Sequence, residues 1–221
     1  NSLTPPNFSL IHNPRICGRG GGVAFMYRSY LKISRVTIPV FESFEALCIR
    51  LTICSASYNF LTVYRPPSSS ITQFKSDFST LLDFLICSPS ELIISGDFNI
   101  HVDCSSSLLT DSFLEMIDSY HLTQHIKFPT HKHGHTLDLL FTRSSSNIIS
   151  SMTWSIPFIS DHYTIHTSVS VPIHSRPSTS TKISRAFRKI HIIAFSKDIL
   201  SSDLSTLTSN LDSYLSHFNT T

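Results

Sequence analysis

A short apolar run, Leu92 to Ile94, leads directly into the segment Ser95-Gly96-Asp97-Phe98-Asn99. An apolar run of this length that ends in turn-forming residues predicts a buried β-strand. Because side chains alternate along a strand, Asp97 and Asn99 are expected on one face of its C-terminal end and Phe98 on the other. A carboxylate and an amide in this position are suited to holding a divalent cation and a phosphate ester.

The pattern from residue 18 to about residue 170 is mainly strand-like, with two helical segments. The helical spacing of apolar residues predicts one helix around Phe74 to Leu85, and another around Phe113 to Ile117 capped by Thr110 or Asp111. Around eight strands with two covering helices predict an α/β (α+β) fold, a two-sheet β-sandwich flanked by helices. The other predicted strands are rich in β-branched and aromatic residues and cover 23–27, 36–41, 46–53, 59–64, 136–142, 148–156 and 163–171.

Composition separates a folded region from a tail. Hydrophobic residues make up 41% of the 221 residues, which is enough to fill the core of one large domain. Past Pro172 the chain is rich in Ser, Thr, Arg and Pro, which is typical of a linker. We therefore expect a domain over 1–175 and a Ser/Thr/basic linker over 176–221 that contains a C-terminal amphipathic helix, with its apolar residues between Leu204 and Phe218.

Several protein classes are disfavoured. No stretch approaches twenty uninterrupted apolar residues and no signal peptide precedes the first strand, so neither a membrane span nor a membrane partner is expected. The five cysteines are odd in number, scattered and without a Cys-x-x-Cys pair, which favours a reducing compartment over a disulfide scaffold. We expect an intracellular protein, nuclear or cytoplasmic.

Two motifs have a simpler interpretation than their appearance suggests. Gly18 to Gly22 precedes a strand and lacks a following Gly-Lys-Ser/Thr, so it predicts a turn and not a nucleotide-binding loop. The alternating histidines His131, His133 and His135 follow Phe128-Pro129-Thr130 and predict a loop. A zinc site there is not favoured, because no Cys or carboxylate completes it at a familiar spacing.

Four segments occur in an informative order along the chain. They are Tyr64-Arg65-Pro66-Pro67, Gly96-Asp97-Phe98-Asn99, Thr136-Leu137-Asp138-Leu139-Leu140 and Ser160-Asp161-His162. Together they resemble the endonuclease/exonuclease/phosphatase superfamily. With the Gly20–Ala24 run and the His101-Val102-Asp103 continuation, residues 1–175 more narrowly resemble the apurinic-type endonuclease domain of a non-LTR (LINE-like, CR1/Rex-type) retrotransposon, whose polyprotein continues into a reverse transcriptase.

The resemblance implies a role for each catalytic position. Asp97 would orient or deprotonate the attacking water, and Asn99 would hydrogen-bond the phosphate. His162 would contact the phosphate, while Asp138 accepts a hydrogen bond from its other ring nitrogen and fixes its tautomer. Tyr64 would donate its phenolic hydrogen near the scissile phosphate.

The resemblance also implies a cofactor, Mg²⁺ or Mn²⁺, with Asp161 close to the ion, and DNA as the partner. The family pattern has an Asn and a main metal-ligand Glu upstream of the Gly-rich turn, yet the seventeen residues before Gly18 contain no Asp or Glu. An N-terminal truncation, with the first strand and helix missing, is therefore expected, and we expect it to impair DNA nicking.

Three functions are compatible with these residues. The first is a divalent-metal-dependent, DNA-nicking endonuclease of a retrotransposon polyprotein. The second is a catalytically inactive relic with weak nucleic-acid binding. The third is a phosphatase acting on a phosphoinositide or another small phosphate ester.

Overall fold

A computed structural model describes residues 4–15, 21–103, 107–156, 160–171 and 191–202. Its elements follow one another along the chain as β1 (Phe8–Asn13), β2 (Val23–Arg28), β3 (Ile33–Val36), β4 (Glu45–Ile53), β5 (Ala56–Tyr64), α1 (Ile71–Ile86), β6 (Glu91–Asp97), α2 (Leu108–Ser119), β7 (Leu122–Gln124), β8 (Asp138–Arg143), β9 (Ile149–Ser155), β10 (Thr164–Val169) and α3 (Ile192–Ser201).

A six-stranded sheet with the order β3-β4-β5-β6-β8-β7 forms the centre of the domain. Its β5 and β6 run parallel, and α1 makes the crossover between them, whereas the other neighbours in this sheet are antiparallel. The prolines Pro66 and Pro67 end β5 because they cannot donate ladder hydrogen bonds. Ser70 then caps α1 by accepting a hydrogen bond from the Gln73 amide.

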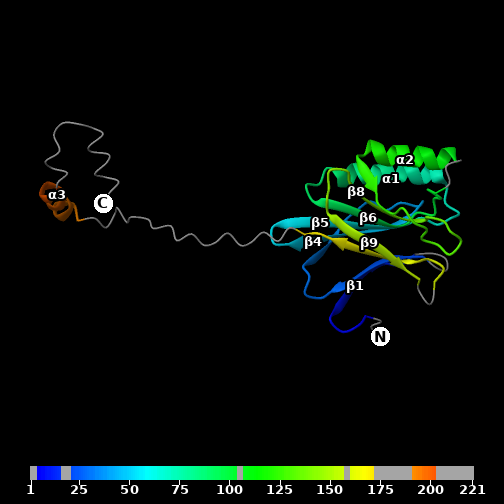
Figure 1. Ribbon diagram of the computed structural model, residues 1–221, viewed down its shortest axis with the longest axis horizontal. Helices are drawn as coiled ribbons and strands as arrows, with labels where there is room; N and C mark the ends of the chain where they lie inside the picture. The colour runs from blue at the N-terminus through cyan, green and yellow to red at the C-terminus, as the bar shows by residue number, and fades with distance from the viewer. Residues whose placement is uncertain (1–3, 16–20, 104–106, 157–159, 172–190, 203–221) are drawn as a thin grey trace. The chain divides into compact units, whose positions relative to one another are not determined.

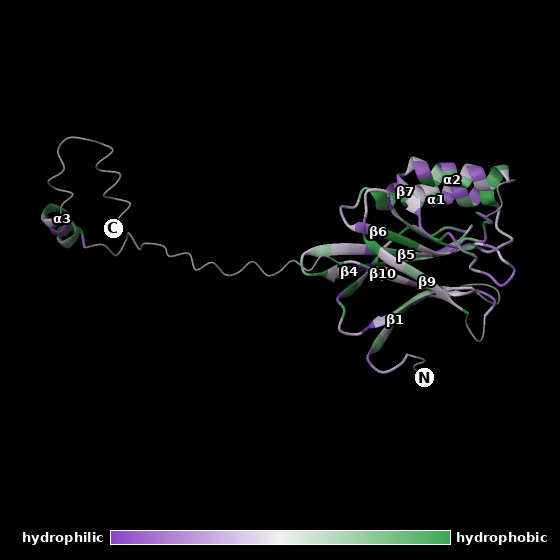
Figure 2. Cartoon of the chain, viewed as in Figure 1, coloured by the Kyte–Doolittle hydropathy of each residue, from purple (hydrophilic) through white to green (hydrophobic). Residues whose placement is uncertain are grey.

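The two helices α1 and α2 cover one face of this sheet (Figure 1). Both carry alternating bands of hydrophilic and hydrophobic residues (Figure 2), as expected for helices with one face on a core. Phe98 packs here, so it points away from the Asp97 face as the strand pattern predicts. The core between helices and sheet is dominated by the fully buried rings of Phe74, Phe78, Phe98, Phe113 and Phe141.

The opposite face of the sheet carries a second apolar cluster. Tyr58, Ile93 and Leu140 project from the large sheet and pack with Met152 of β9 and Ile165 of β10. β9 and β10 form a two-stranded antiparallel sheet, and β1 pairs with β2 in another. The predicted fold class is therefore confirmed: a mixed α/β domain with sheets packed in layers and helices outside.

Some details differ from the sequence-based expectations. The strand β1 was not predicted; it ends at Asn13, because a residue before proline favours the extended conformation. The predicted strand at 36–41 is the earlier segment Ile33–Val36. The cap of α2 is Ser107, whose hydroxyl accepts from the Thr110 amide. The short β7 was not predicted.

The chain divides into two compact units, residues 1–174 and 175–221. The described part of the second unit contains α3, while the helix predicted between Leu204 and Phe218 lies outside the described residues. The glycines Gly18 to Gly20 of the predicted turn also lie outside them. Among the helices in the described ranges, none combines the length and the apolar character needed to cross a membrane.

Candidate active site

One row of side chains crosses four neighbouring strands at an end of the large sheet. Glu45 of β4 pairs with Tyr64 of β5, Tyr64 with Asp97 of β6, and Asp97 with Asp138 of β8. Directly paired residues in neighbouring strands project from the same face of a sheet. The register therefore places Tyr64, Asp97 and Asp138 side by side, on the face opposite α1 and α2.

The turn after β6 fixes the orientation of Asp97. Asn99 has a positive φ of 50°, and its backbone amide donates to Asp97 Oδ1 at 3.1 Å. The Asn99 side-chain nitrogen donates to Asp97 Oδ2 at 3.0 Å and to the Arg65 carbonyl at 2.8 Å. Both side-chain amide hydrogens are thus engaged within the protein. These contacts make Asn99 a positioning residue for Asp97, and they differ from the phosphate-donor role that the resemblance implies.

Arg65 is a buried residue of this site to which sequence reasoning gave no role. Its side chain is only 3% exposed, and Nη1 donates to the carbonyls of Phe98 at 3.2 Å and Asn99 at 3.1 Å. Nη2 donates to the carbonyl of Ser69. A buried guanidinium needs such acceptors. Two of them belong to the turn after β6 and come close only in the folded chain, so the sequence around Arg65 gave no signal of its role.

We expect Arg65→Met to lower the free energy of unfolding by about 3 kcal/mol, because three backbone carbonyls lose their donor inside the protein. Urea denaturation followed by circular dichroism measures this loss. The exposed Arg35 provides a matched control, since Arg35→Met should change the free energy by less than about 1 kcal/mol. Equal effects of the two substitutions would show that Arg65 does not hold the turn.

Asp138 and His162 form a direct pair. His162 Nδ1 lies 2.8 Å from Asp138 Oδ2, with the two side chains 29% and 20% exposed. His162 reaches this position because its segment pairs with the loop before β8. The Lys132 amide donates to the Asp161 carbonyl at 2.9 Å, and the Tyr163 amide donates to the Thr130 carbonyl at 2.7 Å.

The charges of this cluster influence one another. Burial raises the pKa of Asp97, and the neighbouring Asp138 carboxylate raises it further, while the Asn99 amide and His162 act in the opposite direction. Burial lowers the pKa of His162, but the hydrogen bond to Asp138 and the charges of Asp138, Asp97 and Asp161 outweigh it. The net result is a raised pKa for His162, which favours the imidazolium.

The His162 pKa can be measured directly by NMR titration of the imidazole resonances. We expect His162 to titrate above its ordinary value of 6.5. Asp138→Asn removes the charge that raises this pKa and leaves the burial, so the midpoint should fall. Because the folded-state pKa is raised, protonation of His162 stabilises the fold below the unfolded-state pKa, and this contribution is lost as pH rises through the folded-state pKa. An unchanged midpoint in Asp138→Asn would contradict the pairing.

Asp161 lies next to the cluster but makes its own contacts. Its Oδ2 is 3.3 Å from His131 Nε2 and 3.8 Å from Lys132 Nζ, and its side chain is 49% exposed. Its own backbone amide and His131 lower the pKa of Asp161. The His131 ring also lies 4.9 Å from the His162 ring, centroid to centroid. His131 was predicted as a loop residue, and the structure adds it to the site.

The donor set fits a divalent cation. Asp97, Asp138 and His162 place possible ligand atoms within 4.8 Å of one another, and so do His131, Asp161 and His162. Two carboxylates in direct register repel each other, and the Asp138 charge adds to the burial that raises the pKa of Asp97. A cation between them would remove that repulsion. Tyr64 completes the row, and the guanidinium of Arg15 lies 5.6 Å from its ring centroid.

Comparison with solved structures shows that the fold is shared with known proteins. The endonuclease domain of TRAS1, a telomere-specific non-LTR retrotransposon, matches with a TM-score of 0.59 and 12% identity, over 74% of this chain and 78% of that one. The 3′ phosphatase NExo from Neisseria, bound to a product DNA hairpin, matches with a TM-score of 0.52 and 14% identity, over 75% and 80%. TDP2 from D. rerio, complexed with a single-strand DNA product, matches with a TM-score of 0.52 and 11% identity, over 73% and 76%.

The fold that this chain shares with these structures is that of the endonuclease/exonuclease/phosphatase superfamily. Within it, residues 58–166 match the family described as Endonuclease-reverse transcriptase. The resemblance to a retrotransposon endonuclease domain is thus confirmed. No curated protein sequence matches this chain.

Proposed function

We propose that this domain hydrolyses phosphodiester bonds in DNA with the help of a divalent cation. One observation carries the proposal: Asp97 and Asp138 are paired in register, and His162 is bound to Asp138. Phosphodiester hydrolysis requires a base for water and donors for the phosphate oxygens, and this cluster offers both beside each other.

Each side chain has a defined task in this proposal. Asp97 is held by Asn99 and accepts a proton from the attacking water. Asp138 fixes the Nδ1 proton of His162, so the Nε2–H of the imidazolium is available to donate to a phosphate oxygen. The raised pKa of His162 keeps this donor protonated over a wider pH range.

The cation, Mg²⁺ or Mn²⁺, would neutralise negative charge on the phosphate when bound. Asp97 and Asp138 are the residues that would hold it, and Asp161 lies next to them on the neighbouring segment. Oxygen ligands are those that Mg²⁺ prefers.

DNA is the proposed substrate for two reasons. The family description names an endonuclease linked to a reverse transcriptase. In addition, the structures of TDP2 and NExo are complexes with DNA products. We therefore also propose that a reverse transcriptase module follows the 1–175 domain, with the 176–221 segment as the linker between them.

A substrate panel tests the proposal. We expect the chain to convert supercoiled plasmid to open circles in the presence of Mg²⁺ or Mn²⁺, at a slow rate because the family pattern's Glu ligand is not among its residues. EDTA should abolish this conversion. Faster release of phosphate from inositol phosphates than plasmid nicking would favour the phosphatase alternative, for which the mannosyl-6-phosphatase Bt3783 is a structural neighbour with a TM-score of 0.53 and 13% identity. A plasmid that stays supercoiled under all metal conditions would favour the inactive relic.

A further inference from the structure

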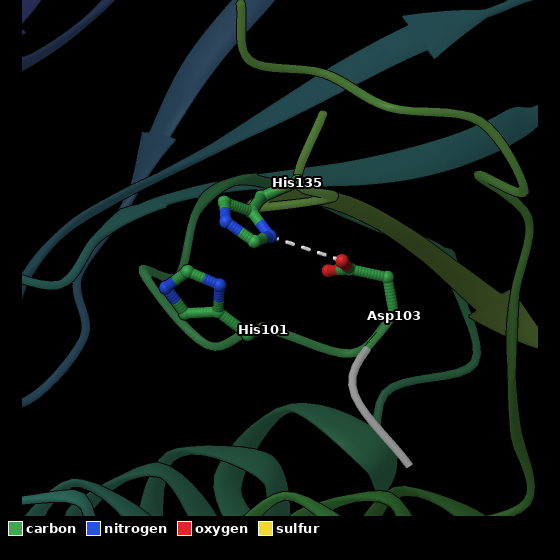
Figure 3. Close-up of side chains that lie close together, drawn as sticks. All are labelled: His101, Asp103 and His135. Atoms are coloured by element: carbon green, nitrogen blue, oxygen red, sulfur yellow. Dashed lines mark hydrogen bonds and ion pairs between the residues drawn. The ribbon is translucent and has the colours of Figure 1, made fainter. Parts of the chain in front are cut away.

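A second histidine–carboxylate cluster lies outside the residues assigned to hydrolysis. It consists of His101, Asp103 and His135, which come from two loops: one follows β6, and the other precedes β8 (Figure 3). His135 Nδ1 is 3.1 Å from Asp103 Oδ2, and the rings of His101 and His135 are 4.2 Å apart, centroid to centroid. One possible ligand atom from each residue lies within 4.8 Å of the other two.

Asp103 is fixed in its orientation by the opposite loop. Its Oδ1 accepts a hydrogen bond from the Thr136 amide at 3.0 Å, which leaves Oδ2 facing His135. Partial burial raises the pKa of Asp103, but the Thr136 amide and His135 outweigh it, so the pKa is lowered overall. The carboxylate is therefore charged at neutral pH. Outer hydrogen bonds of this kind orient carboxylates and imidazoles that bind metals.

The spacing of these atoms suits a tetrahedral metal ion. Ligands that each lie about 2.1 Å from a tetrahedral Zn²⁺ are about 3.4 Å from one another. The 3.1 Å separation of His135 Nδ1 and Asp103 Oδ2 is close to that value. For both atoms to bind the metal, the proton between His135 Nδ1 and Asp103 Oδ2 has to leave this position. In the neutral imidazole, Nε2 can carry that proton instead.

We propose that His101, Asp103 and His135 form a binding site for Zn²⁺ or a chemically similar late first-row divalent cation. Two imidazoles and one carboxylate favour such ions over Mg²⁺, which prefers oxygen ligands throughout. Three protein ligands leave the fourth tetrahedral position for water. The sequence disfavoured a zinc site because it showed no carboxylate near the histidines, and the fold supplies Asp103 and His101 from another loop.

Metal binding here would fasten two loops that carry the proposed catalytic machinery. His101 stands two residues after Asn99, and His135 stands three residues before Asp138. The ion would hold the turn that orients Asp97 against the segment that enters β8. The site is therefore a positioning site, and it is distinct from the cation that Asp97 and Asp138 would hold.

Calorimetric titration of the full chain with Zn²⁺, in excess Mg²⁺, tests the proposal. We expect the chain to bind one equivalent that the double variant His101→Ala/His135→Ala does not bind. The exposed His12 offers a matched control, because His12→Ala removes an imidazole outside the cluster and should leave this equivalent unchanged. His131→Ala should also retain this Zn²⁺ equivalent, since His131 belongs to the separate group of possible ligands formed with Asp161 and His162.

Asp103→Asn provides a second, milder variant. Asparagine keeps an oxygen for the Thr136 amide but loses the charge, so we expect at least about tenfold weaker Zn²⁺ binding with the fold intact by circular dichroism. Side-chain NMR of the chain should show the nitrogen resonances of His101 and His135 shifting on Zn²⁺ addition. Zn²⁺ binding that is unchanged in both the double variant and Asp103→Asn would overturn the proposal, as would loss of the equivalent in His131→Ala alone.

Discussion

Asp97→Asn should reduce plasmid nicking by about 10³-fold, within the 10²–10⁴ range that a positioned acid or base typically contributes. Asparagine has nearly the same shape as aspartate but cannot accept the proton of the attacking water. The rates of plasmid conversion, measured under single-turnover conditions in Mn²⁺, give the factor directly.

The control for this substitution is Asp118→Asn. Asp118 is an exposed carboxylate on α2, on the other side of the large sheet from Asp97. The loss of the Asp118 charge should leave the nicking rate within about twofold of that of the unsubstituted chain, since surface substitutions away from an active site have small effects. If Asp97→Asn nicks plasmid as fast as Asp118→Asn, then Asp97 does not take part in hydrolysis.

Gly96→Ala should cost about 3 to 5 kcal/mol of unfolding free energy, which is large for one methyl group. Gly96 has a φ of +149°, and a Cβ added there would lie 1.8 Å from the Val63 carbonyl oxygen of the adjacent parallel strand. Val63 is 1% exposed within the core and cannot move aside cheaply. The shift would also displace Asp97, the next residue, so the nicking rate should fall as well.

Gly134→Ala is the matched control for this effect. Gly134 has a φ of +85°, and an added Cβ would meet nothing within 4 Å. Alanine there carries only the cost of the left-handed backbone conformation, about 1 kcal/mol. Urea denaturation of the two variants separates these contributions. An equal loss in both would mean that the contact with Val63 is not what requires a glycine at position 96.

The strand that ends at Asp97 could be predicted from sequence because its signals are local. Leu92 to Ile94 form an unbroken apolar run, and the glycine and aspartate that follow end it. Helix α1 could be predicted for the same reason, since its five buried residues recur at helical spacing. By contrast, β7 has only three residues, which is too short to show a pattern.

The contacts of the site were harder to predict, because they join distant segments. The pairing of Asp138 with His162 followed from the resemblance alone, and nothing in the local sequence indicates which carboxylate meets which imidazole. The role of Arg65 was not predicted, because an arginine before two prolines has the sequence pattern of an exposed turn. The double use of the Asn99 amide depends on a carbonyl of Arg65 that is brought close only by parallel pairing of β5 and β6.

Paramagnetic Mn²⁺ tests most directly whether Asp97 and Asp138 hold the cation beside His162. Small amounts of Mn²⁺ added to the ¹⁵N-labelled chain broaden the NMR signals of nearby amides. We expect the strongest broadening at the amides of Asp97, Asn99, Asp138 and His162, its reversal by excess Mg²⁺, and its loss in the double variant Asp97→Asn/Asp138→Asn. Broadening centred on other residues, or broadening at these amides that persists in the double variant, would contradict a metal-dependent site at this end of the sheet.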